Sequence, residues 1–445
     1  MSVSEPAQKT APKSAAKVAA AAFKAKIEAA VERVEAIRAD RAAQVEAIRV
    51  ESAAQVEAIS AERQAARDER EAARSVSHQA QVQEALTRTE LTLALTEALI
   101  GRAQAQAHWR AESLRRYLSE RTPRRLPPRG RFAAQTQRLL RALGSPGQAL
   151  LIEKSALWRG TGNRLHDLRH MAAYVRRGAD PGLQPPTLFD HAGYIERYAD
   201  VRAAGASPLA HYLAAGAAED RTPHPLFDVA YYRAENAAEL AATPLTPFGH
   251  YLAAGAARAR NPHPLFDIAH YAAQATDMAP DEDPLSHYLT EGWRRSYSPH
   301  PLFDPAWYRQ GAPRSARETP PLLHYVTAGW RKGVSPHPLF DPAWYLAQNP
   351  DVAQAGFEPL AHFATHGAHE GRSPSPWFDL PHYVAARGEA LSASANPLVD
   401  YLQGGAWAVA ESRPGFPTAA YLAATPELVR QGLTPLEHWA RRQAR

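Results

Sequence analysis

The sequence predicts an all-α protein in which a long N-terminal coiled-coil helix precedes a tandem array of helical hairpins, an α-solenoid-like arrangement. Two observations predict this class. A short phrase returns every 37 to 39 residues through the second half of the chain, and an eleven-residue pattern runs through an N-terminal segment that is low in Gly and Pro. A repeat of this length is typical of stacked helical units that bury their apolar faces against one another.

The returning phrase is an apolar pair, an aspartate after the phenylalanine, and a tyrosine five residues after it. It occurs seven times, and we number copies 1 to 7 by these phenylalanines. The repeat-defining residues are Phe189, Asp190 and Tyr194; Phe227, Asp228 and Tyr232; Phe266, Asp267 and Tyr271; Phe303, Asp304 and Tyr308; Phe340, Asp341 and Tyr345; Phe378, Asp379 and Tyr383; and Phe416 and Tyr421.

The chemistry of one copy predicts its first helix. Asp341 is expected to cap free amides of the first turn, and Pro342 suits the first helical position. Phe340 and Tyr345 have the spacing of a hydrophobic staple, which sets the angle at which the chain enters the helix. In copy 7 Pro417 stands where the other copies have the capping aspartate, a departure typical of a terminal copy.

A second helix is expected about twenty residues later, opened in copy 1 by Ser207-Pro208. Leu209, Tyr212 and Leu213 then form an apolar stripe of helical spacing, and Gly216 is placed where a left-handed C-cap belongs. Each copy therefore reads as a short two-helix hairpin.

The N-terminal helix is expected to self-associate as a dimer or trimer. A Val-Glu-Ala-Ile phrase recurs every eleven residues, a period that keeps one seam nearly straight along the helix. A lone helix cannot bury such a stripe. The expected oligomer seam consists of Val34, Ile37, Val45, Ile48, Val56 and Ile59.

We expect five regions along the chain. They are a disordered tail over residues 1–16, the long helix or coiled coil over 17–118, an Arg/Pro linker over 119–131, a short helical segment over 132–180, and the seven hairpin repeats over 181–445.

Charge is divided unevenly between the two halves. Residues 1–180 carry 31 basic and 20 acidic groups, a balance of +11, whereas residues 181–445 carry 20 and 26, a balance of −6. An arginine-rich linker attracts anionic surfaces, so peripheral contact with an anionic membrane is an alternative role for the N-terminal part. Nucleic acid is disfavoured, because no recognised binding module surrounds these arginines. The candidate anionic-surface residues are Arg121, Arg124, Arg125, Arg129 and Arg131.

Histidine recurs in the second helix, and on a helical wheel it lies opposite the apolar stripe. We therefore expect it to face a neighbouring copy or solvent, either in an inter-repeat hydrogen bond or in a row of ligand-contacting groups shared with Trp293, Trp307, Trp330, Trp344 and Trp377. No metal is expected, because these histidines lack metal-pair spacing. The candidate ligand surface comprises His211, His250, His287, His324, His362 and His438.

Two segments carry a resemblance to a known family. Copy 5 contains Pro342-Ala-Trp-Tyr345, Asn349-Pro350-Asp351-Val352 and Pro359-Leu-Ala-His362, and it resembles repeats attached to bacterial glycosyltransferases and rhamnan-synthesis-type proteins that build O-antigen, capsule and other cell-surface polysaccharides. Ser155-Ala-Leu-Trp158-Arg159-Gly-Thr161 is similar to a segment that follows the coiled coil in such proteins, although the next residues, Gly-Asn-Arg-Leu, depart from the usual continuation.

The resemblance implies a role in surface-polysaccharide assembly, with an assembly enzyme or a glycan as partner. The sequence has no pattern of a nucleotide-sugar transferase domain and no cysteine, and no cofactor is expected. We therefore expect a non-catalytic oligomeric scaffold, cytoplasmic or peripheral to the inner membrane face. The alternatives are an extracellular or particle-associated glycan-attachment protein, and an unrecognised transferase or accessory part of one.

Overall fold

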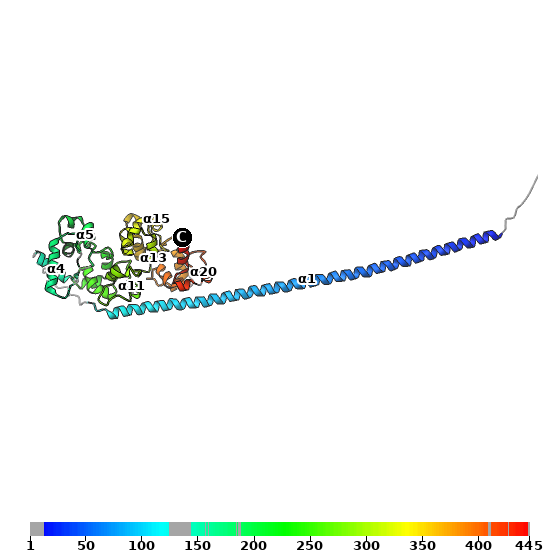
Figure 1. The fold of residues 1–445 in the computed structure, drawn as a ribbon, viewed down its shortest axis with the longest axis horizontal. Helices are drawn as coiled ribbons and strands as arrows, with labels where there is room; N and C mark the ends of the chain where they lie inside the picture. The colour runs from blue at the N-terminus through cyan, green and yellow to red at the C-terminus, as the bar shows by residue number, and fades with distance from the viewer. Residues whose placement is uncertain are drawn as a thin grey trace, which may run out of the picture. The chain divides into compact units, whose positions relative to one another are not determined.

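The computed structural model describes residues 13–123, 144–155, 157–158, 160–183, 185, 188–407, 411–425 and 427–443 (Figure 1). Over these residues the protein is helical and has no β-strand, which confirms the all-α class. The chain separates into two compact units, Met1–Glu90 and Leu91–Arg445. Each unit is considered by itself below.

Helix α1 spans Lys13–Glu120 without a break. It begins inside the segment expected to be a disordered tail, so residues 13–16 belong to the helix. The local composition explains the correction, because Lys-Ser-Ala-Ala at this point is compatible with helix and contains no Gly or Pro. Residues 1–12 lie outside the described residues, as do 124–143, which include most of the predicted linker.

Two helices follow before the repeats, α3 over Gly144–Lys154 and α4 over Arg164–Arg177. Each copy then opens with a helix of seven or eight residues. In copies 1 to 6 the aspartate after the repeat phenylalanine caps this helix, as Asp228 does by accepting from the Tyr231 amide at 2.9 Å. These first helices are α5 His191–Arg197, α8 Val229–Glu235, α11 Ile268–Gln274, α13 Pro305–Gly311, α15 Pro342–Gln348, α18 Leu380–Arg387 and α20 Thr418–Ala424.

The second element of copies 1 to 6 is a single α-turn that continues into a π-helical turn. The α-turns are α7 Pro208–His211, α10 Pro247–His250, α12 Pro284–His287, α14 Pro321–His324, α17 Pro359–His362 and α19 Pro397–Asp400. The π-turns are η1 Tyr212–Gly216, η2 Tyr251–Gly255, η4 Tyr288–Gly292, η6 Tyr325–Gly329, η8 Phe363–Gly367 and η10 Tyr401–Gly405. In copy 7 the corresponding helix, α22 Pro435–Gln443, remains α-helical.

The prediction that Gly216 is a left-handed C-cap is wrong. Gly216 lies inside the π-turn, and the Ala217 amide donates to the Tyr212 carbonyl five residues earlier at 2.8 Å. The left-handed residue comes later, for example Asp220 with φ 51°.

The two-helix description of a copy is also incomplete. Most copies insert a further short helix between the two predicted ones, and two copies add one after the π-turn. The inserted helices are α6 Ala199–Ala203, α9 Ala237–Ala241, η5 Arg314–Ala316, α16 Pro350–Ala355, η9 Gly388–Ala390 and α21 Leu428–Gln431, and the added ones are η3 Ala256–Arg258 and η7 Trp330–Lys332.

The core of the Leu91–Arg445 unit is built from the repeated aromatic side chains. In copy 4 the Phe303 ring lies 5.3 Å from the Tyr308 ring and 5.7 Å from the Tyr325 ring, and all three residues are buried. The staple contact between the repeat phenylalanine and tyrosine recurs in all seven copies at centroid distances from 5.0 to 5.4 Å. The rings therefore connect the entry of the first helix to the second helix of the same copy.

Successive copies are joined by backbone hydrogen bonds. The amide of each capping aspartate donates to a carbonyl that precedes the next copy, as Asp304 does to Pro336 at 2.9 Å. Two second-helix tyrosines make another such link: the Tyr288 hydroxyl accepts from the Leu322 amide of the next copy at 3.0 Å, and the Tyr401 hydroxyl accepts from the Leu436 amide at 3.1 Å. Neighbouring copies thus share polar backbone contacts in addition to apolar ones.

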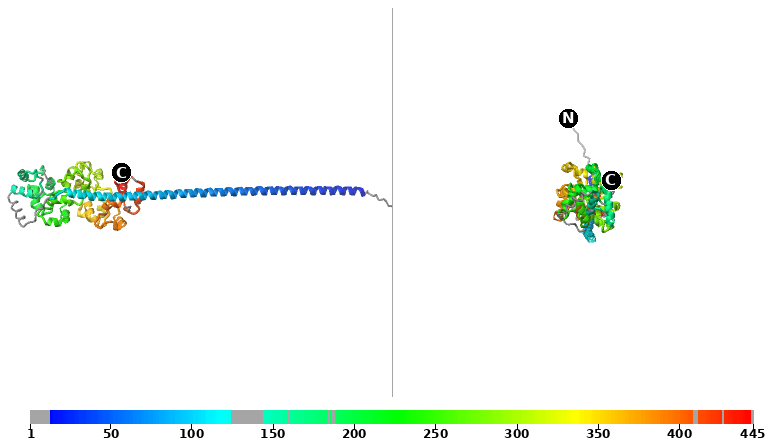
Figure 2. Two further views of the ribbon diagram at one scale, coloured as in Figure 1. Left: turned by 90° about the horizontal axis from the view of Figure 1, so that it is seen from below. Right: turned by 90° about the vertical axis from the view of Figure 1, so that its left-hand side faces the viewer.

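Contacts also reach beyond nearest neighbours. The C-terminal end of α1, coloured cyan in Figure 1 and seen from below in Figure 2, lies against several copies within the same unit. The Tyr117 hydroxyl donates to the Ala256 carbonyl of copy 2, while Ala103 lies beside Gly404 of copy 6. Contacts in this unit are therefore not confined to adjacent copies, because α1 touches copies 2 and 6 and α22 reaches copy 4.

Candidate functional site

The six second-helix histidines, which were predicted to form a ligand surface, are hydrogen bonded within their own copies. In copy 3 the Tyr271 hydroxyl and His287 Nδ1 are 2.7 Å apart, and in copy 2 the same atoms of Tyr232 and His250 are 2.8 Å apart. Copy 6 replaces histidine by Asp400, which accepts from the Tyr383 hydroxyl. The remaining pairs are Tyr194–His211, Tyr308–His324, Tyr345–His362 and Tyr421–His438.

These pairs correct the helical-wheel prediction, in which the histidine avoided its own hairpin. The first-helix tyrosine reaches across to the histidine, so no neighbouring copy is needed. His250 and His287 are buried, and the other four are half-buried. Because one ring nitrogen is already engaged, each histidine has at most its other nitrogen for a further contact.

The glycine that ends each π-turn makes room for this pair. A Cβ on Gly216 would lie 2.2 Å from the Tyr194 hydroxyl oxygen, and the corresponding distances in copies 2 to 6 are between 1.7 and 2.0 Å. Real Cβ atoms do not approach so closely. The glycine is therefore required by the tyrosine of the first helix and not by its own backbone conformation.

Replacing Gly216 by alanine should lower the free energy of unfolding by about 2 kcal/mol, because the new methyl group overlaps the Tyr194 hydroxyl. Adding Tyr194→Phe removes the overlapping oxygen and should recover most of the loss, apart from about 1 kcal/mol for the lost hydrogen bond. Urea unfolding of the two single variants and the double variant measures this coupling. Gly101→Ala, which meets no atom within 4 Å, is the control and should not destabilise the protein.

A second set of histidines lies in the loops before the repeat phenylalanines. His263 Nδ1 accepts from the Leu265 amide at 3.0 Å, and His224 does the same for Leu226. Both side chains are buried, and burial lowers the pKa of each to about 4. These histidines are therefore neutral at pH 7, and they hold the turn that leads into each phenylalanine.

The tryptophans predicted to complete a sugar-binding row are partly covered. Trp293 is buried, and Trp307, Trp330, Trp344 and Trp377 are half-buried. Arginines lie over three of the rings, with the Arg294 guanidinium 4.6 Å above Trp293, the Arg331 guanidinium 4.3 Å above Trp330 and the Arg441 guanidinium 5.6 Å above Trp307. Cation–π contacts within the chain thus use faces that a sugar would stack on.

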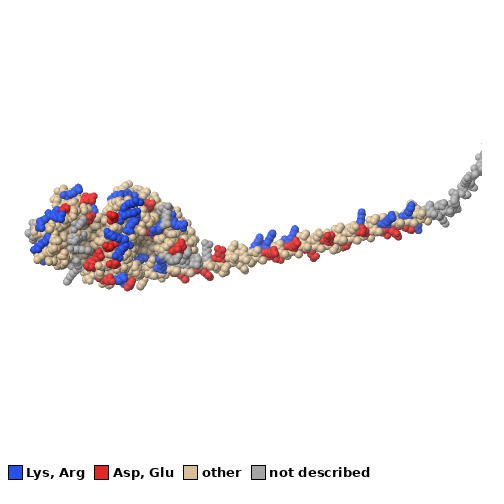
Figure 3. All heavy atoms as spheres, viewed as in Figure 1, with Lys and Arg blue, Asp and Glu red and all other residues tan. Residues whose placement is uncertain are grey.

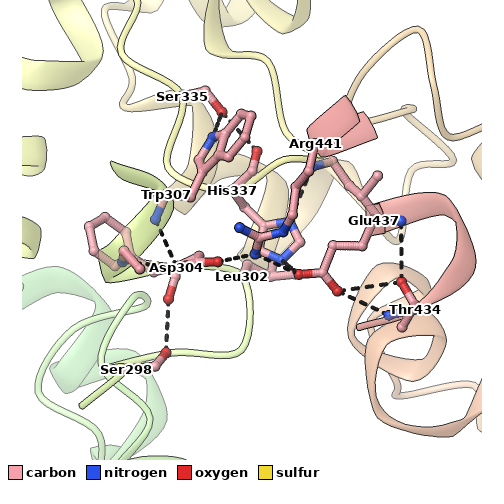
Figure 4. Close-up of polar contacts among 12 residues, drawn as sticks. Ser298, Leu302, Asp304, Trp307, Ser335, His337, Thr434, Glu437 and Arg441 are labelled. Atoms are coloured by element: carbon pink, nitrogen blue, oxygen red, sulfur yellow. Dashed lines mark hydrogen bonds and ion pairs between the residues drawn. The ribbon is translucent and has the colours of Figure 1, made fainter. Parts of the chain in front are cut away.

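A buried polar cluster joins copy 7 to copies 4 and 5 (Figure 4). Arg441 of α22 donates to Asp304, the cap of α13, and to Glu437 at 2.9 Å. Glu437 Oε1 is in turn 3.9 Å from His337 Nε2. Burial alone would raise the pKa of Asp304, but the Trp307 amide and the Arg441 charge outweigh it and lower that pKa. The cluster is an ion-pair network that connects segments more than 130 residues apart.

Arg441→Met should lower the free energy of unfolding by about 2 kcal/mol. The change preserves most of the side-chain length but leaves Asp304 and Glu437 without their cation in a partly buried place. Thermal unfolding followed by circular dichroism at pH 7 measures the loss. Arg442→Met, on the neighbouring exposed side chain, is the matched control, and an equal effect of both changes would contradict the assigned role of Arg441.

Arg121 does not serve the predicted anionic-surface contact. Its guanidinium is buried and donates to the carbonyls of Ala279, Pro280 and Glu282. It also lies 4.4 Å above the Tyr117 ring. Arg121 therefore fastens the end of α1 to copy 3. The other predicted contacts, Arg124, Arg125, Arg129 and Arg131, lie outside the described residues.

The predicted oligomer seam is exposed in the single chain. Its six valines and isoleucines have exposed fractions from 48% to 67%. These values establish that the seam residues are accessible, and the number of helices that associate through them stays a prediction.

Sequence reasoning missed a partial copy before copy 1. The Tyr174 hydroxyl accepts from the Leu209 amide at 3.3 Å, which is the link that second-helix tyrosines make to the next copy. It is also 2.8 Å from His191 Nδ1. The signal was present in the spacing, because Tyr174 and Gly178 stand 38 residues before Tyr212 and Gly216.

Within the described residues, no group of three or more His, Cys, Asp and Glu side chains is arranged to hold a metal ion. Among the same residues, none of the helices combines the length and apolarity that crossing a membrane requires. No family model matches the chain, and no match was found among curated proteins or solved structures. The fold defines an all-helical protein with repeated units, and its function rests on the proposal below.

Proposed function

We propose that this protein is a non-catalytic oligomeric scaffold in bacterial surface-polysaccharide assembly. In this proposal α1 forms a coiled coil that joins several chains, and the repeats form an α-solenoid-like array that holds a partner enzyme or a growing glycan. The assignment to polysaccharide assembly rests on the resemblance of copy 5 and of the segment from Ser155 to Thr161 to repeat-containing proteins of that process.

The observation that carries the scaffold role is how the repeated polar groups are used. The first-helix tyrosine hydroxyls, second-helix histidines, loop histidines and capping aspartates all bond to partners inside the array. Groups that recur in copy after copy therefore maintain the geometry of the copies. A protein built in this way presents its partners with a surface of defined shape.

The inter-copy contacts support an array that behaves as one body. Each capping aspartate links to the next copy, Arg441 connects copy 7 to the non-adjacent copy 4, and Arg121 fastens the end of α1 to copy 3. A partner that contacts several copies would then meet them at set distances, which lowers the ordering cost of binding.

The test is a gene deletion in the source bacterium, followed by measurement of extracted surface polysaccharide. The proposal expects a loss of polysaccharide, its recovery with the wild-type chain, and co-purification of a sugar transferase or of the polymer with the tagged full-length protein. Polysaccharide that is unchanged by the deletion would overturn the proposal. Sugar-nucleotide turnover by the purified chain would overturn its non-catalytic part and favour the transferase alternative.

The extracellular attachment alternative is distinguished by binding. Purified full-length protein that binds defined glycans on an array, and that co-purifies with no transferase, would favour an attachment protein. Fractionation of intact cells with an antibody to the repeats would then locate it outside the cell.

A further inference from the structure

The charged side chains of α1 are segregated onto opposite sides of the helix. Residues 24–74 contain ten Lys and Arg and eleven Asp and Glu. When residues are placed at three turns per eleven, nine of the ten basic residues fall within about 70° of the midline of the Val/Ile seam, and ten of the eleven acidic residues lie more than about 90° from it. Figure 3 shows Lys and Arg along one edge of the helix and Asp and Glu along the other.

We call the side that carries the seam the front face. Its midline is the position occupied by Arg41, Ser52 and Arg63, and the valine and isoleucine rows lie on either side of it. All of these side chains are exposed. The front face is therefore an apolar ridge with arginine along its middle.

We call the opposite side the back face. It carries an alanine stripe, interrupted once by Val50, between two acidic rows. The alanines are Ala36, Ala39, Ala43, Ala47, Ala54, Ala58, Ala61 and Ala65, and the two acidic rows are Glu35, Glu46, Glu57 and Asp40, Glu51, Glu62. Small side chains let a second helix approach closely. The back face is therefore a shallow apolar channel with carboxylates on both sides.

Contacts within the helix do not neutralise this arrangement. The nearest intrahelical pairs in the segment, Lys24 with Glu28 and Arg49 with Glu46, are 3.7 Å apart, and their side chains are 64% to 78% exposed. Exposed pairs of this kind contribute little to stability. Like charges on each face instead repel along the helix, so each face gains from an oppositely charged surface with the same period.

We propose that residues 24–74 of α1 associate front to back, with the arginine-bearing ridge of one chain lying in the alanine channel of a second copy. Front-to-front pairing in register would bring Arg41 and Arg63 against their own counterparts at the centre of the contact, where unpaired charge is costly. Front-to-back pairing places arginine between two rows of carboxylates. Both faces repeat every eleven residues, about 16.5 Å along the helix axis. A register that pairs arginine with carboxylates at one repeat therefore pairs them at every repeat.

This inference rests on the proposed oligomerisation of α1 and specifies its surface. Each chain has a front face and a back face on opposite sides of α1, so a pair of chains leaves one front face and one back face free. Such contacts are heterologous, and heterologous contacts that do not close add further copies. We therefore expect the mass of the full-length protein to rise with concentration beyond that of a dimer.

The experiment is light scattering coupled to size exclusion on the full-length protein at low and high salt. The wild type should associate at 50 mM salt and dissociate at about 1 M, where charges are screened beyond about 3 Å. A front-reversed variant, Arg41→Glu with Arg63→Glu and Arg74→Glu, and a back-reversed variant, Glu35→Lys with Glu46→Lys and Glu57→Lys, should each fail to self-associate. An equimolar mixture of the two should associate again.

A neutral variant separates the two geometries. Arg41→Leu with Arg63→Leu removes charge and adds apolar area to the front face, so front-to-front pairing predicts tighter association. Front-to-back pairing predicts at least about tenfold weaker association, because the carboxylate rows lose their partners. Leu, Glu and Lys all favour helix, so circular dichroism should show that every variant keeps its helix content.

A wild type that is monomeric at every salt concentration would overturn both the oligomeric scaffold and this inference. Two outcomes would overturn only the inference. One is association of the wild type that does not depend on salt, and the other is tighter association of the Arg41→Leu/Arg63→Leu variant than of the wild type. Reversed variants that fail to recover association on mixing would also overturn it, as would a monomer that becomes helical only on vesicles containing anionic lipid.

Discussion

Phe303→Ala should lower the free energy of unfolding of the repeat unit by about 4 kcal/mol, the largest effect that we expect from a single substitution. Phe303 is 1% exposed and its ring contacts the rings of Tyr308 and Tyr325. Removing the ring leaves a cavity between rigid aromatic neighbours that cannot collapse into it. Urea unfolding followed by circular dichroism and tyrosine fluorescence measures the loss.

Phe357→Ala is the matched control, because Phe357 is 58% exposed and its removal should change stability by less than about 0.5 kcal/mol. An unfolding curve of Phe303→Ala that coincides with the wild type would refute the staple as the main apolar contact of a copy.

Acidification from pH 6.5 to pH 4 should destabilise the repeats by several kcal/mol. In the unfolded chain, histidine takes up a proton near its ordinary pKa of about 6.5. In the fold, burial lowers the pKa of His224 and His263 to about 4. The stability that these neutral rings allow is complete above about pH 6.5 and is lost as the pH falls to about 4, at about 3 kcal/mol per histidine.

The double variant His224→Asn/His263→Asn should flatten this pH dependence. An asparagine side chain can accept from the amide two residues on, as the histidine Nδ1 does, but it does not titrate. Urea midpoints at several pH values between 4 and 7.5 measure the effect. His78→Asn, at an exposed site on α1, should leave the pH profile unchanged, and a double variant with the wild-type profile would contradict the role of the loop histidines.

Local features of this fold were predictable from the sequence because the groups that create them are close together along the chain. An aspartate directly after the repeat phenylalanine defines a capped helix start, and the Phe-to-Tyr interval of five brings the two rings together at that start. Asp304 and Asp341 accept from amides two or three residues ahead, as the capping interpretation requires. The all-α class follows from six such starts and a seventh in which Pro417 replaces the aspartate.

The side-chain partnership of Tyr271 and His287 was not predictable in the same way. It joins two elements sixteen residues apart, and its geometry depends on a π-turn that no residue of the second helix specifies alone. A helical wheel assumes 100° per residue, whereas a π-turn adds a residue to the turn and changes which side chains share a face. The terminal glycine was the available signal, but its spacing also suited a C-cap.

The positions of Arg121 and Arg441 depend on tertiary structure and could not be inferred from composition. Arg121 lies in a basic, proline-rich stretch, a composition that is typical of residues that bind anionic surfaces. Only the fold shows that its guanidinium faces backbone carbonyls of copy 3. Likewise, nothing near Arg441 in the sequence indicates Asp304, which lies 137 positions away. Self-association of the long helix and the role in polysaccharide assembly stay predictions.

The bond between Arg441 and Asp304 has a consequence for how this gene can evolve. In an open array, recombination can duplicate or delete one unit with little loss of stability, because every unit contacts only the unit before it and the unit after it. Here the last unit must arrive opposite the fourth, and inserting or losing a unit between them would rotate and translate α22 away from its anion. We therefore expect descendants of this gene to keep two whole units, copies 5 and 6, between the units that carry these two residues, and to vary in length elsewhere.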